Sequence, residues 1–277
     1  MNLPIYQVDA FTLQVFGGNP AAVIPLEEWL DDKLLQAIAN ENNLSETAFF
    51  VNCGTVESSS STFELRWFTP AAEVAMCGHA TLATAHVLFT HLKITDSQVC
   101  FKTKSGLLTV IRHGDSYKMD FPAVPSQLLT INNSLDDLLK GLDIDQDKVV
   151  SVSSGTDYLV ELSSQEDVEQ LTPKASFWLN LGVRGVIVTA LSHDSGTDFV
   201  SRCFYPEISV PEDPVTGSAH CQLTPFWSDK LGKTKLAAVQ LSKRRGSLDC
   251  ELVTQPTGDR VQLIGKVADY MVGQITI

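Results

Sequence analysis

The residues best suited to chemistry are two carboxylates and a histidine beside apolar segments. Glu46 enters an apolar strand-like run, and burial there would suit it to proton transfer near neutral pH because an apolar environment disfavours the charged carboxylate. His79 follows Gly78 at the start of an apolar helical segment, and Asp213 stands four residues before Gly217. Each residue alone also has a structural interpretation, as a solvated strand end or a satisfied core histidine. The sequence pattern around these residues must therefore show whether their role is functional or structural.

Cys77 leaves a second chemistry open. It precedes Gly78, and a helix N-terminus is expected to acidify a neighbouring thiol. Its counterpart in the second half of the chain is Thr216, so a racemase with two thiols is not expected. A Cys77–His79 dyad is not favoured either, because residues i and i+2 do not naturally meet around a turn. The other histidines of the two apolar segments are interpreted as core residues (His86, His91) or left undecided between a helix cap and a ligand contact (His220).

An internal repeat surrounds these residues. The first copy reads Arg66-Trp-Phe-Thr-Pro and then Glu73-Val-Ala-Met-Cys-Gly-His-Ala. The second reads Arg202-Cys-Phe-Tyr-Pro and then Glu212-Asp-Pro-Val-Thr-Gly-Ser-Ala. The arginines are 136 residues apart and the glutamates 139, a period too long for a solenoid. The repeat therefore predicts two related domains.

In each copy, the glycine stands at a turn that leads into an apolar helical segment. The first-turn N–H groups of a helix lack intrahelical partners and lie at its positive end, and glycine lets a ligand approach the backbone closely. If the domains pack about a pseudo-twofold axis, the two turns face each other and hold a carboxylate by backbone donors. The alternative is that both glycines only cap helices.

Short strands and a few helices must position the two turns. Apolar spacing predicts a helix over 30–40, and the segments 78–92 and 218–231 are apolar almost all round, which is typical of helices buried on every face. The first domain is expected over 1–122 and the second over 123–277, with a linker at 122–133, while the last strand-like run, 262–277, fits either domain. β-Branched and aromatic runs predict strands at 5–8, 21–24, 47–51, 62–68, 99–102 and 107–111.

Composition limits the partners and the compartment. The chain has 277 residues and a formal net charge of −13, which repels phosphate backbones and anionic membrane faces, so neither nucleic acid nor a membrane is an expected partner. The N-terminus resembles no secretory signal and the six cysteines form no C-x-x-C pair, which favours a cytoplasmic protein with reduced thiols, core-filling except at Cys77. Nucleotide, metalloprotease and hydrolase motifs are missing from the sequence, so the expected chemistry needs no metal and no cofactor.

Five blocks of residues resemble the phenazine-biosynthesis (PhzF-like) isomerase family. The resemblance implies a diaminopimelate-epimerase-like fold, an α+β protein of two similar domains, each a mixed β-sheet barrel curled round a central helix, with the site between them. It also implies a cofactor-free isomerase that is often a homodimer. The blocks are Gly18-Asn-Pro-Ala-Ala-Val, Asn43-Leu-Ser-Glu-Thr-Ala-Phe, Arg66-Trp-Phe-Thr-Pro, Cys77-Gly-His-Ala-Thr and Glu212-Asp-Pro-Val-Thr-Gly-Ser-Ala-His.

The same resemblance implies the roles of individual residues. The family's acid/base glutamate falls on Glu46, its assisting histidine on His79 and its assisting aspartate on Asp213. Phenazine-pathway isomerases resemble Ala-Gly-His-Pro at the first turn and Thr-Gly-Ser-Ala-Ala at the second, whereas this chain has Cys-Gly-His-Ala and Thr-Gly-Ser-Ala-His, so their substrate does not carry over. The implied substrate contacts are Asn19, Gly78, Gly217 and Ser218.

The sequence thus predicts an isomerase that moves a proton within a small anionic carboxylate metabolite. Two alternatives stay open. One is a thiol-dependent racemase or epimerase that uses Cys77, and the other is a non-catalytic module that binds a small molecule or a protein on the same scaffold.

Overall fold

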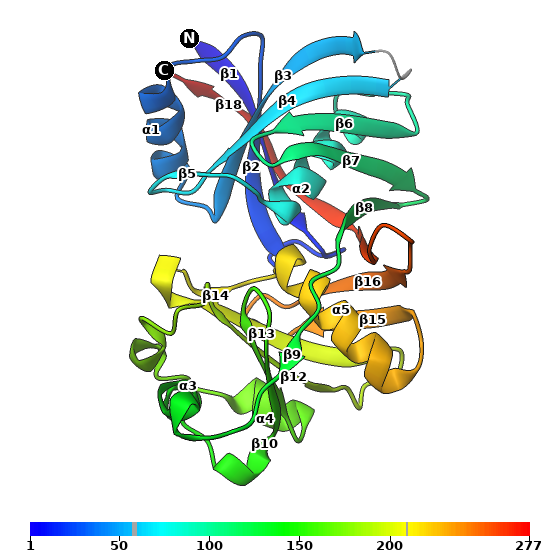
Figure 1. Cartoon of the computed structure of the whole chain (residues 1–277). Coiled ribbons are helices and arrows are strands. Elements are labelled where there is room, and N and C mark those ends of the chain that lie inside the picture. The colour runs from blue at the N-terminus through cyan, green and yellow to red at the C-terminus, as the bar shows by residue number, and fades with distance from the viewer. Residues whose placement is uncertain (57–59, 209) are drawn as a thin grey trace. The chain divides into compact units, whose positions relative to one another are not determined.

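The computed structural model describes residues 1–56, 60–208 and 210–277, and the chain divides into two compact units. Unit 1 comprises Met1–Asp120 together with Ile264–Ile277, and unit 2 comprises Phe121–Leu263 (Figure 1). No helix among the described residues is both long and apolar enough to cross a bilayer.

Unit 1 is a mixed sheet curled round one buried helix. Pairing follows the order β18–β1–β2–β3–β4–β6–β7–β8, with the short β5 beside the end of β4; β2–β3 and β4–β6 are parallel and the other pairs are antiparallel. Helix α2 packs against β1, β2, β3, β7 and β18, while helix α1 covers β3 and β4. The elements are β1 (Asn2–Ala10), β2 (Asn19–Leu26), α1 (Asp32–Asn42), β3 (Glu46–Val56), β4 (Ser60–Phe68), β5 (Glu73–Val74), α2 (Gly78–Thr90), β6 (Gln98–Thr103), β7 (Gly106–His113), β8 (Ser116–Pro122) and β18 (Val267–Thr276).

Helix α2 is buried on every face, as its composition predicts. Every residue from His79 to Phe89 is buried, and its threonines are satisfied within the helix. The hydroxyl of Thr81 donates to the carbonyl of Cys77 at 2.6 Å, and that of Thr84 donates to the carbonyl of Ala80 at 2.7 Å. The helix ends at Thr90, two residues before the predicted end, and His91 is its C-cap.

Unit 2 repeats this plan with its own strands and helices. Pairing follows β9–β10–β11–β12–β13–β15–β16, with β14 beside β13, and helix α5 packs on β15 and β16. The elements are β9 (Gln127–Leu128), α3 (Asp136–Leu142), β10 (Val149–Ser154), β11 (Tyr158–Leu162), α4 (Gln165–Gln170), β12 (Val186–Leu191), β13 (Phe199–Tyr205), β14 (Val210–Asp213), α5 (Gly217–Leu231), β15 (Lys235–Gln240), β16 (Gly246–Val253) and β17 (Arg260–Gly265), with 3₁₀ turns at Asn133–Leu135, Gln146–Lys148, Ala175–Trp178 and Pro206–Ile208.

Helix α5 accommodates a proline in its interior. Pro225 has no N–H to donate to the carbonyl of Cys221, which would leave that carbonyl without its helical partner. The backbone N–H of Val124 donates to it instead, at 2.9 Å. A segment expected to be a plain linker therefore completes the hydrogen bonding of the helix.

The strand order is the same in both units. In unit 1, β2, β3, β4, β6 and β7 follow one another as parallel, antiparallel, parallel and antiparallel pairs. In unit 2, β11, β12, β13, β15 and β16 do the same. The buried helix enters at the same point, after β5 in one unit and after β14 in the other. This confirms the predicted fold class of two similar domains with mixed sheets.

The repeated arginine and glutamate make the same contact in each unit. Nε and Nη2 of Arg66 donate to the two carboxylate oxygens of Glu73 at 2.8 and 2.9 Å. The same atoms of Arg202 donate to Glu212 at 2.7 and 3.0 Å. In both units the guanidinium also lies 5.1 Å from the ring of the phenylalanine two residues later. The repeat in the sequence thus corresponds to an arginine–glutamate ion pair that joins β4 to β5 in unit 1 and β13 to β14 in unit 2. We call this ion pair the bracket of each unit.

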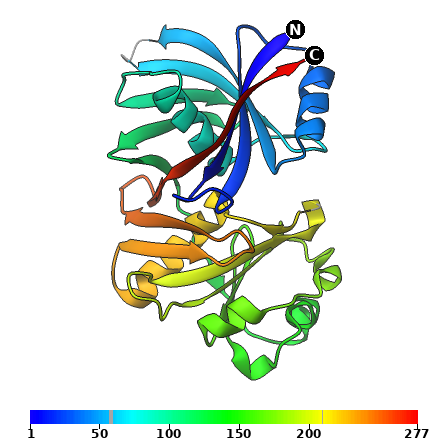
Figure 2. The same cartoon turned by 180° about the vertical axis from the view of Figure 1, so that it is seen from behind.

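Two expectations about smaller elements are wrong. The run 262–277 is not one strand, because β17 ends at Gly265 and β18 begins at Val267; β18 pairs antiparallel with β1, from Asn2 opposite Thr276 to Ala10 opposite Val267 (Figure 2). Cys53 is only half-buried, since β3 is irregular there, whereas the other five cysteines are buried.

Candidate active site

Glu46 and His79 meet where β3 begins beside the first turn of α2. Oε2 of Glu46 lies 3.0 Å from Nε2 of His79, and their side chains are 17% and 7% exposed. The amide nitrogen of Asn19, at the start of β2, lies 3.2 Å from Nδ1 of the same ring. Since a donor faces Nδ1, the neutral ring carries its proton on Nε2, and the protonated ring carries one there too. In either state, the protonated nitrogen is the one that lies 3.0 Å from Oε2 of Glu46.

The charge on His79 is set by its neighbours. Burial alone favours the neutral imidazole, but the neighbouring Cys77 and Glu46 side chains outweigh it and raise the pKa of His79 well above its usual value. Burial also raises the pKa of Cys77, to about 11, so that its thiol is uncharged at neutral pH. The carboxylate of Glu46 is therefore the charge that favours the imidazolium.

Two expectations about Cys77 are wrong. Sγ lies 3.5 Å from Nδ1 of His79, so residues i and i+2 do meet. Cys77 is the N-cap of α2 in an extended conformation, with φ −149° and ψ 107°, and an N-cap side chain of this kind turns back over the first turn of its helix. The thiol is not acidified, because burial and then the neighbouring Glu46 raise its pKa.

Gly18 places Asn19, a role that the sequence interpretation missed. Its φ is +58°, and a Cβ there would lie 2.1 Å from the carbonyl oxygen of Ala10, the residue that pairs with Asn19 across β1–β2. Only a glycine fits this close approach of two backbones. The signal available in the sequence was the glycine directly before Asn19.

In unit 2, Asp213 closes the turn that leads into α5. Its Oδ2 accepts a hydrogen bond from the hydroxyl of Thr216 at 2.6 Å. Gln240 of β15 holds the same turn, since its amide nitrogen donates to the carbonyl of Asp213 at 2.7 Å and its amide oxygen accepts from the backbone N–H of Thr216 at 2.9 Å. Gly217 and Ser218 then open the helix. Nothing in the sequence marks Gln240, which lies 24 residues beyond the turn it supports.

The two turns share one conformation. Thr216, the N-cap of α5, is extended with φ −115° and ψ 100°, as Cys77 is in α2. Neither N-cap side chain accepts a hydrogen bond from its own helix. The N–H groups of both first turns therefore have no side-chain cap, which is the condition for anion binding at a helix N-terminus.

His220 caps the turn, which is one of the two roles left open for it. Its Nδ1 donates to the backbone carbonyl of Thr216 at 2.7 Å, and its side chain is fully buried. Burial lowers the pKa of His220 to about 4, so the ring is neutral in the core.

The predicted site residues form one group in each unit. Asn19, Glu46, Gly78 and His79 lie together in unit 1, and Asp213, Gly217 and Ser218 lie together in unit 2. Each group surrounds the N-terminus of the buried helix of its unit. That both groups serve one substrate stays a prediction.

Unit 2 has no carboxylate at the position that corresponds to Glu46. The residue after Glu46 pairs with Phe68, and the residue after Gly185 pairs with Phe204, the matching phenylalanine of the repeat. Gly185 is thus the counterpart of Glu46. A Cβ there would lie 2.2 Å from the ring of Tyr205, so an aromatic side chain fills the corresponding space.

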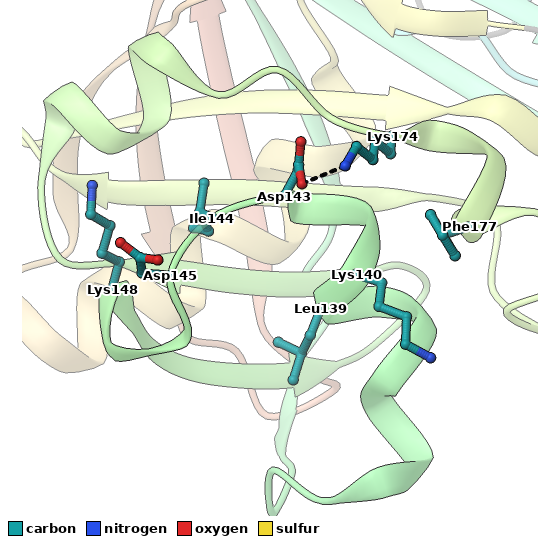
Figure 3. A pocket seen from close by; sticks show the side chains of 8 residues that line it. All are labelled: Leu139, Lys140, Asp143, Ile144, Asp145, Lys148, Lys174 and Phe177. Carbon is teal, nitrogen blue, oxygen red and sulfur yellow. Dashed lines mark hydrogen bonds and ion pairs between the residues drawn. The ribbon is translucent and has the colours of Figure 1, made fainter.

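Unit 2 also has a surface hollow of about 560 Å³ (Figure 3). None of the predicted site residues lines it. Three lysines give it a basic appearance, but each is paired with a carboxylate, so it offers no uncompensated charge to an anion. The pairs are Lys140 with Asp137 at 3.5 Å, Lys148 with Asp167 at 2.7 Å and Lys174 with Asp143 at 2.7 Å.

Comparison with known proteins identifies the family. The family model described as phenazine biosynthesis-like protein matches residues 8–273. The chain belongs to this family. An uncharacterized isomerase of Pseudomonas aeruginosa is 48% identical over 276 residues, which cover 99% of each chain. The human phenazine biosynthesis-like domain-containing protein is 42% identical, and the alignment covers 100% of both chains.

Solved structures agree with this assignment. A crystal structure of a PhzF-family phenazine biosynthesis protein of Enterococcus faecalis is similar with a TM-score of 0.89, at 41% identity and with 100% of both chains covered. A hydroxyproline epimerase of Agrobacterium vitis is only 9% identical but shares the fold, with a TM-score of 0.59 over 99% of this chain and 92% of that one. The sequence relatives that are named isomerases, such as the one of Pseudomonas aeruginosa at 48% identity, support an isomerase-type enzyme.

Proposed function

We propose that this phenazine biosynthesis-like protein is a cofactor-independent isomerase that moves a proton within a small carboxylate-bearing metabolite. The observation that carries the proposal is the contact of 3.0 Å between Glu46 and His79 at the first turn of a buried helix. A carboxylate and an imidazole at this distance form an acid/base pair that needs no prosthetic group.

In the proposed reaction, Glu46 removes a proton from a substrate carbon and returns it at another position. Oε2 is held by the ring of His79, which leaves Oε1 for the substrate proton. The imidazolium of His79 and the uncapped N–H groups at the start of α2 stabilise the negative charge that develops on the substrate. Asp213 is proposed to move a heteroatom proton, while Asn19, Gly78, Gly217 and Ser218 hold the carboxylate.

Solvent deuterium incorporation tests this proposal and identifies the substrate in the same measurement. The protein is incubated in D₂O with a library of small carboxylates, and mass spectrometry detects the compounds that gain deuterium at carbon. We expect Glu46→Gln to abolish incorporation, and His79→Asn and Asp213→Asn to reduce it, whereas Cys77→Ala should retain it. Full activity of Glu46→Gln on a substrate so identified would overturn the assignment.

The two alternative functions give different outcomes in the same experiment. A thiol-dependent racemase would lose deuterium incorporation at a stereocentre in Cys77→Ala and keep it in Glu46→Gln. The thiol of Cys77 lies 3.5 Å from Nδ1 of His79, which is the observation in favour of this candidate, but its pKa of about 11 disfavours the thiolate. A non-catalytic module would bind a ligand with no incorporation, and Glu46→Gln would leave its binding unchanged.

The proposal also includes a cytoplasmic location and a homodimer. Analytical ultracentrifugation of the purified chain measures its oligomeric state, and a monomer would contradict the proposed homodimer. The net charge of −13 supports an exclusion of nucleic acid as a partner, and the two uncapped helix ends support an anionic metabolite despite that charge.

A further inference from the structure

A second cluster of titratable side chains lies in unit 1, apart from Glu46. His86 is in the last two turns of α2, His91 is the C-cap of the same helix, and Asp269 is on β18. Nε2 of His86 and Nε2 of His91 both point at Oδ1 of Asp269, at 3.0 and 2.8 Å. The expectation that both histidines are core residues is wrong for His91, whose side chain is 22% exposed because the helix ends before it.

The three groups offer the donor set of a transition-metal site. Two imidazole nitrogens and one carboxylate oxygen lie within 4.8 Å of one another. Ligand atoms at about 2.0–2.1 Å from a zinc ion lie roughly 3–3.4 Å apart, so the observed spacing needs only a small outward movement of Asp269. We propose that His86, His91 and Asp269 bind a divalent first-row transition-metal ion of the zinc type. This proposal is independent of the proposed isomerase reaction.

The surroundings of the cluster are those of a metal centre. The other nitrogen of His86, Nδ1, lies 3.0 Å from the hydroxyl of Tyr117, which in turn lies 3.3 Å from the hydroxyl of Thr90. If Nε2 binds a metal, Nδ1 carries the proton and donates it to Tyr117, an outer partner of the kind that orients metal-binding histidines. The ring of His91 packs on that of Tyr6 at 4.9 Å, which fixes its direction as well.

Charge and access also favour a cation here. The cluster lies at the C-terminal end of α2, where the helix dipole is negative. The last turn itself contains no basic residue, and the nearby guanidinium of Arg112 donates to the carbonyl of Phe89 at 3.4 Å. The side chain of Asp269 is 44% exposed, so an ion can reach the cluster from solvent. The remaining coordination positions would be filled by water, since the chain supplies three ligands. Such an ion would link β18 to α2, the helix against which this strand packs.

The test is direct titration of the metal-free protein. After treatment with EDTA, the full chain is titrated with Zn²⁺ by calorimetry and with Co²⁺ by visible absorption, which reports the ligand field. We expect one ion per chain, binding at least 100-fold weaker in His91→Ala and Asp269→Asn, and about 10-fold weaker in Tyr117→Phe, which removes only the outer partner. Circular dichroism shows which variants fold. If His91→Ala does not fold, the metal affinity of the nearly isosteric Asp269→Asn variant tests the proposal.

Two control variants distinguish this metal site from other possible metal-binding positions. The exposed pair His193–Glu166, at 3.6 Å, is a matched histidine–carboxylate contact, so His193→Ala should leave the binding unchanged. Glu46, Cys77 and His79 also lie within ligand distance of one another, so Cys77→Ala tests that cluster and should keep one bound ion. Binding that is absent from the unaltered chain overturns the proposal, as does binding that is lost in Cys77→Ala but kept in Asp269→Asn.

Discussion

Glu46 and His79 form a carboxylate–imidazole pair, with Oε2 and Nε2 3.0 Å apart, while the Cys77 thiol contacts the opposite ring nitrogen. The two neighbours differ chemically, because one is a carboxylate and the other is a thiol whose pKa is raised by burial. We predict that Glu46→Gln lowers the pKa of His79 markedly, whereas Cys77→Ala leaves it raised. Heteronuclear NMR of the imidazole nitrogens across a pH titration measures both. A large drop in Cys77→Ala would show that the thiol carries charge after all.

The raised pKa of His79 also predicts how stability depends on pH. The folded state binds this proton more tightly than the unfolded state, whose histidine titrates near 6.5. The contribution of the pair is therefore complete below pH 6.5 and is lost as the pH rises through the higher folded pKa. Urea unfolding between pH 6 and 9 (about half a unit below and about 2.5 units above the usual histidine value) should show this loss, and Glu46→Gln should remove it. An unaltered profile in that variant would contradict the assignment of Glu46 as the partner.

The bracket between Arg66 and Glu73 predicts an acid-sensitive element. The guanidinium, which donates to both oxygens, holds the pKa of Glu73 at about 2, below its usual value of 4.5. Its contribution is present above pH 4.5 and is lost as the pH falls toward 2. We expect Glu73→Gln to lower the free energy of unfolding by about 2 kcal/mol at neutral pH and to weaken this acid dependence. Glu212→Gln, which alters the matching bracket of unit 2, is the parallel variant; an unchanged stability in Glu73→Gln would contradict the prediction.

Gly18 provides a test of how Asn19 is positioned. Gly18→Ala places a methyl group 2.1 Å from the carbonyl oxygen of Ala10 and also forces a left-handed conformation on an alanine. We expect a loss of about 2–4 kcal/mol in unfolding free energy, from conformational strain and overpacking together. Gly114 is the control, since it has a similar φ of +62° but open space, so Gly114→Ala should show only the conformational part. Equal losses in both variants would remove the argument from close approach.

Gly185 tests the asymmetry between the units. A Cβ at this position would meet the ring of Tyr205 at 2.2 Å and the carbonyl oxygen of Phe204 at 2.4 Å. We expect Gly185→Ala to destabilise the protein by about 1–3 kcal/mol in chemical denaturation. Gly273→Ala is the matched control, because its nearest neighbour is 3.8 Å away. If Gly185→Ala were as stable as the control, unit 2 would have room for a second acid/base side chain.

The sequence predicts the framework of this protein well because the framework repeats. The pairs Arg66–Glu73 and Arg202–Glu212 need the same residue types at the same spacing in both units, so they remain visible as identities. Helices apolar on every face have few possible environments, which is why the burial of α2 could be predicted. The same expectation holds only in part for α5, because Ser218, Asp229 and Lys230 are exposed. The placement of Gly78 and His79 at the start of α2 follows from the same two features, whereas Glu46, whose counterpart is Gly185, is not marked by the repeat.

The remaining features depend on contacts that spacing does not reveal. The support of the Asp213 turn by Gln240 joins residues on different strands, and nothing around Gln240 is unusual in sequence. The pKa of Cys77 depends on its burial and on its contacts with Glu46 and His79, which composition does not reveal. The meeting of His86 and His91 with Asp269 joins positions 183 and 178 residues apart. A contact between single residues that are far apart in the sequence produces no periodic pattern from which it could be predicted.

The pairing of β18 with β1 bears on how the chain folds as it is synthesised. Unit 2 is one continuous segment, Phe121–Leu263, whereas unit 1 needs Ile264–Ile277 for its last strand. Translation therefore delivers every strand of the second unit before the first unit has its own full set. Until then, one edge of β1 has unpaired backbone groups, an edge that invites wrong partners. The part of the protein that is made first is thus the last to be completed.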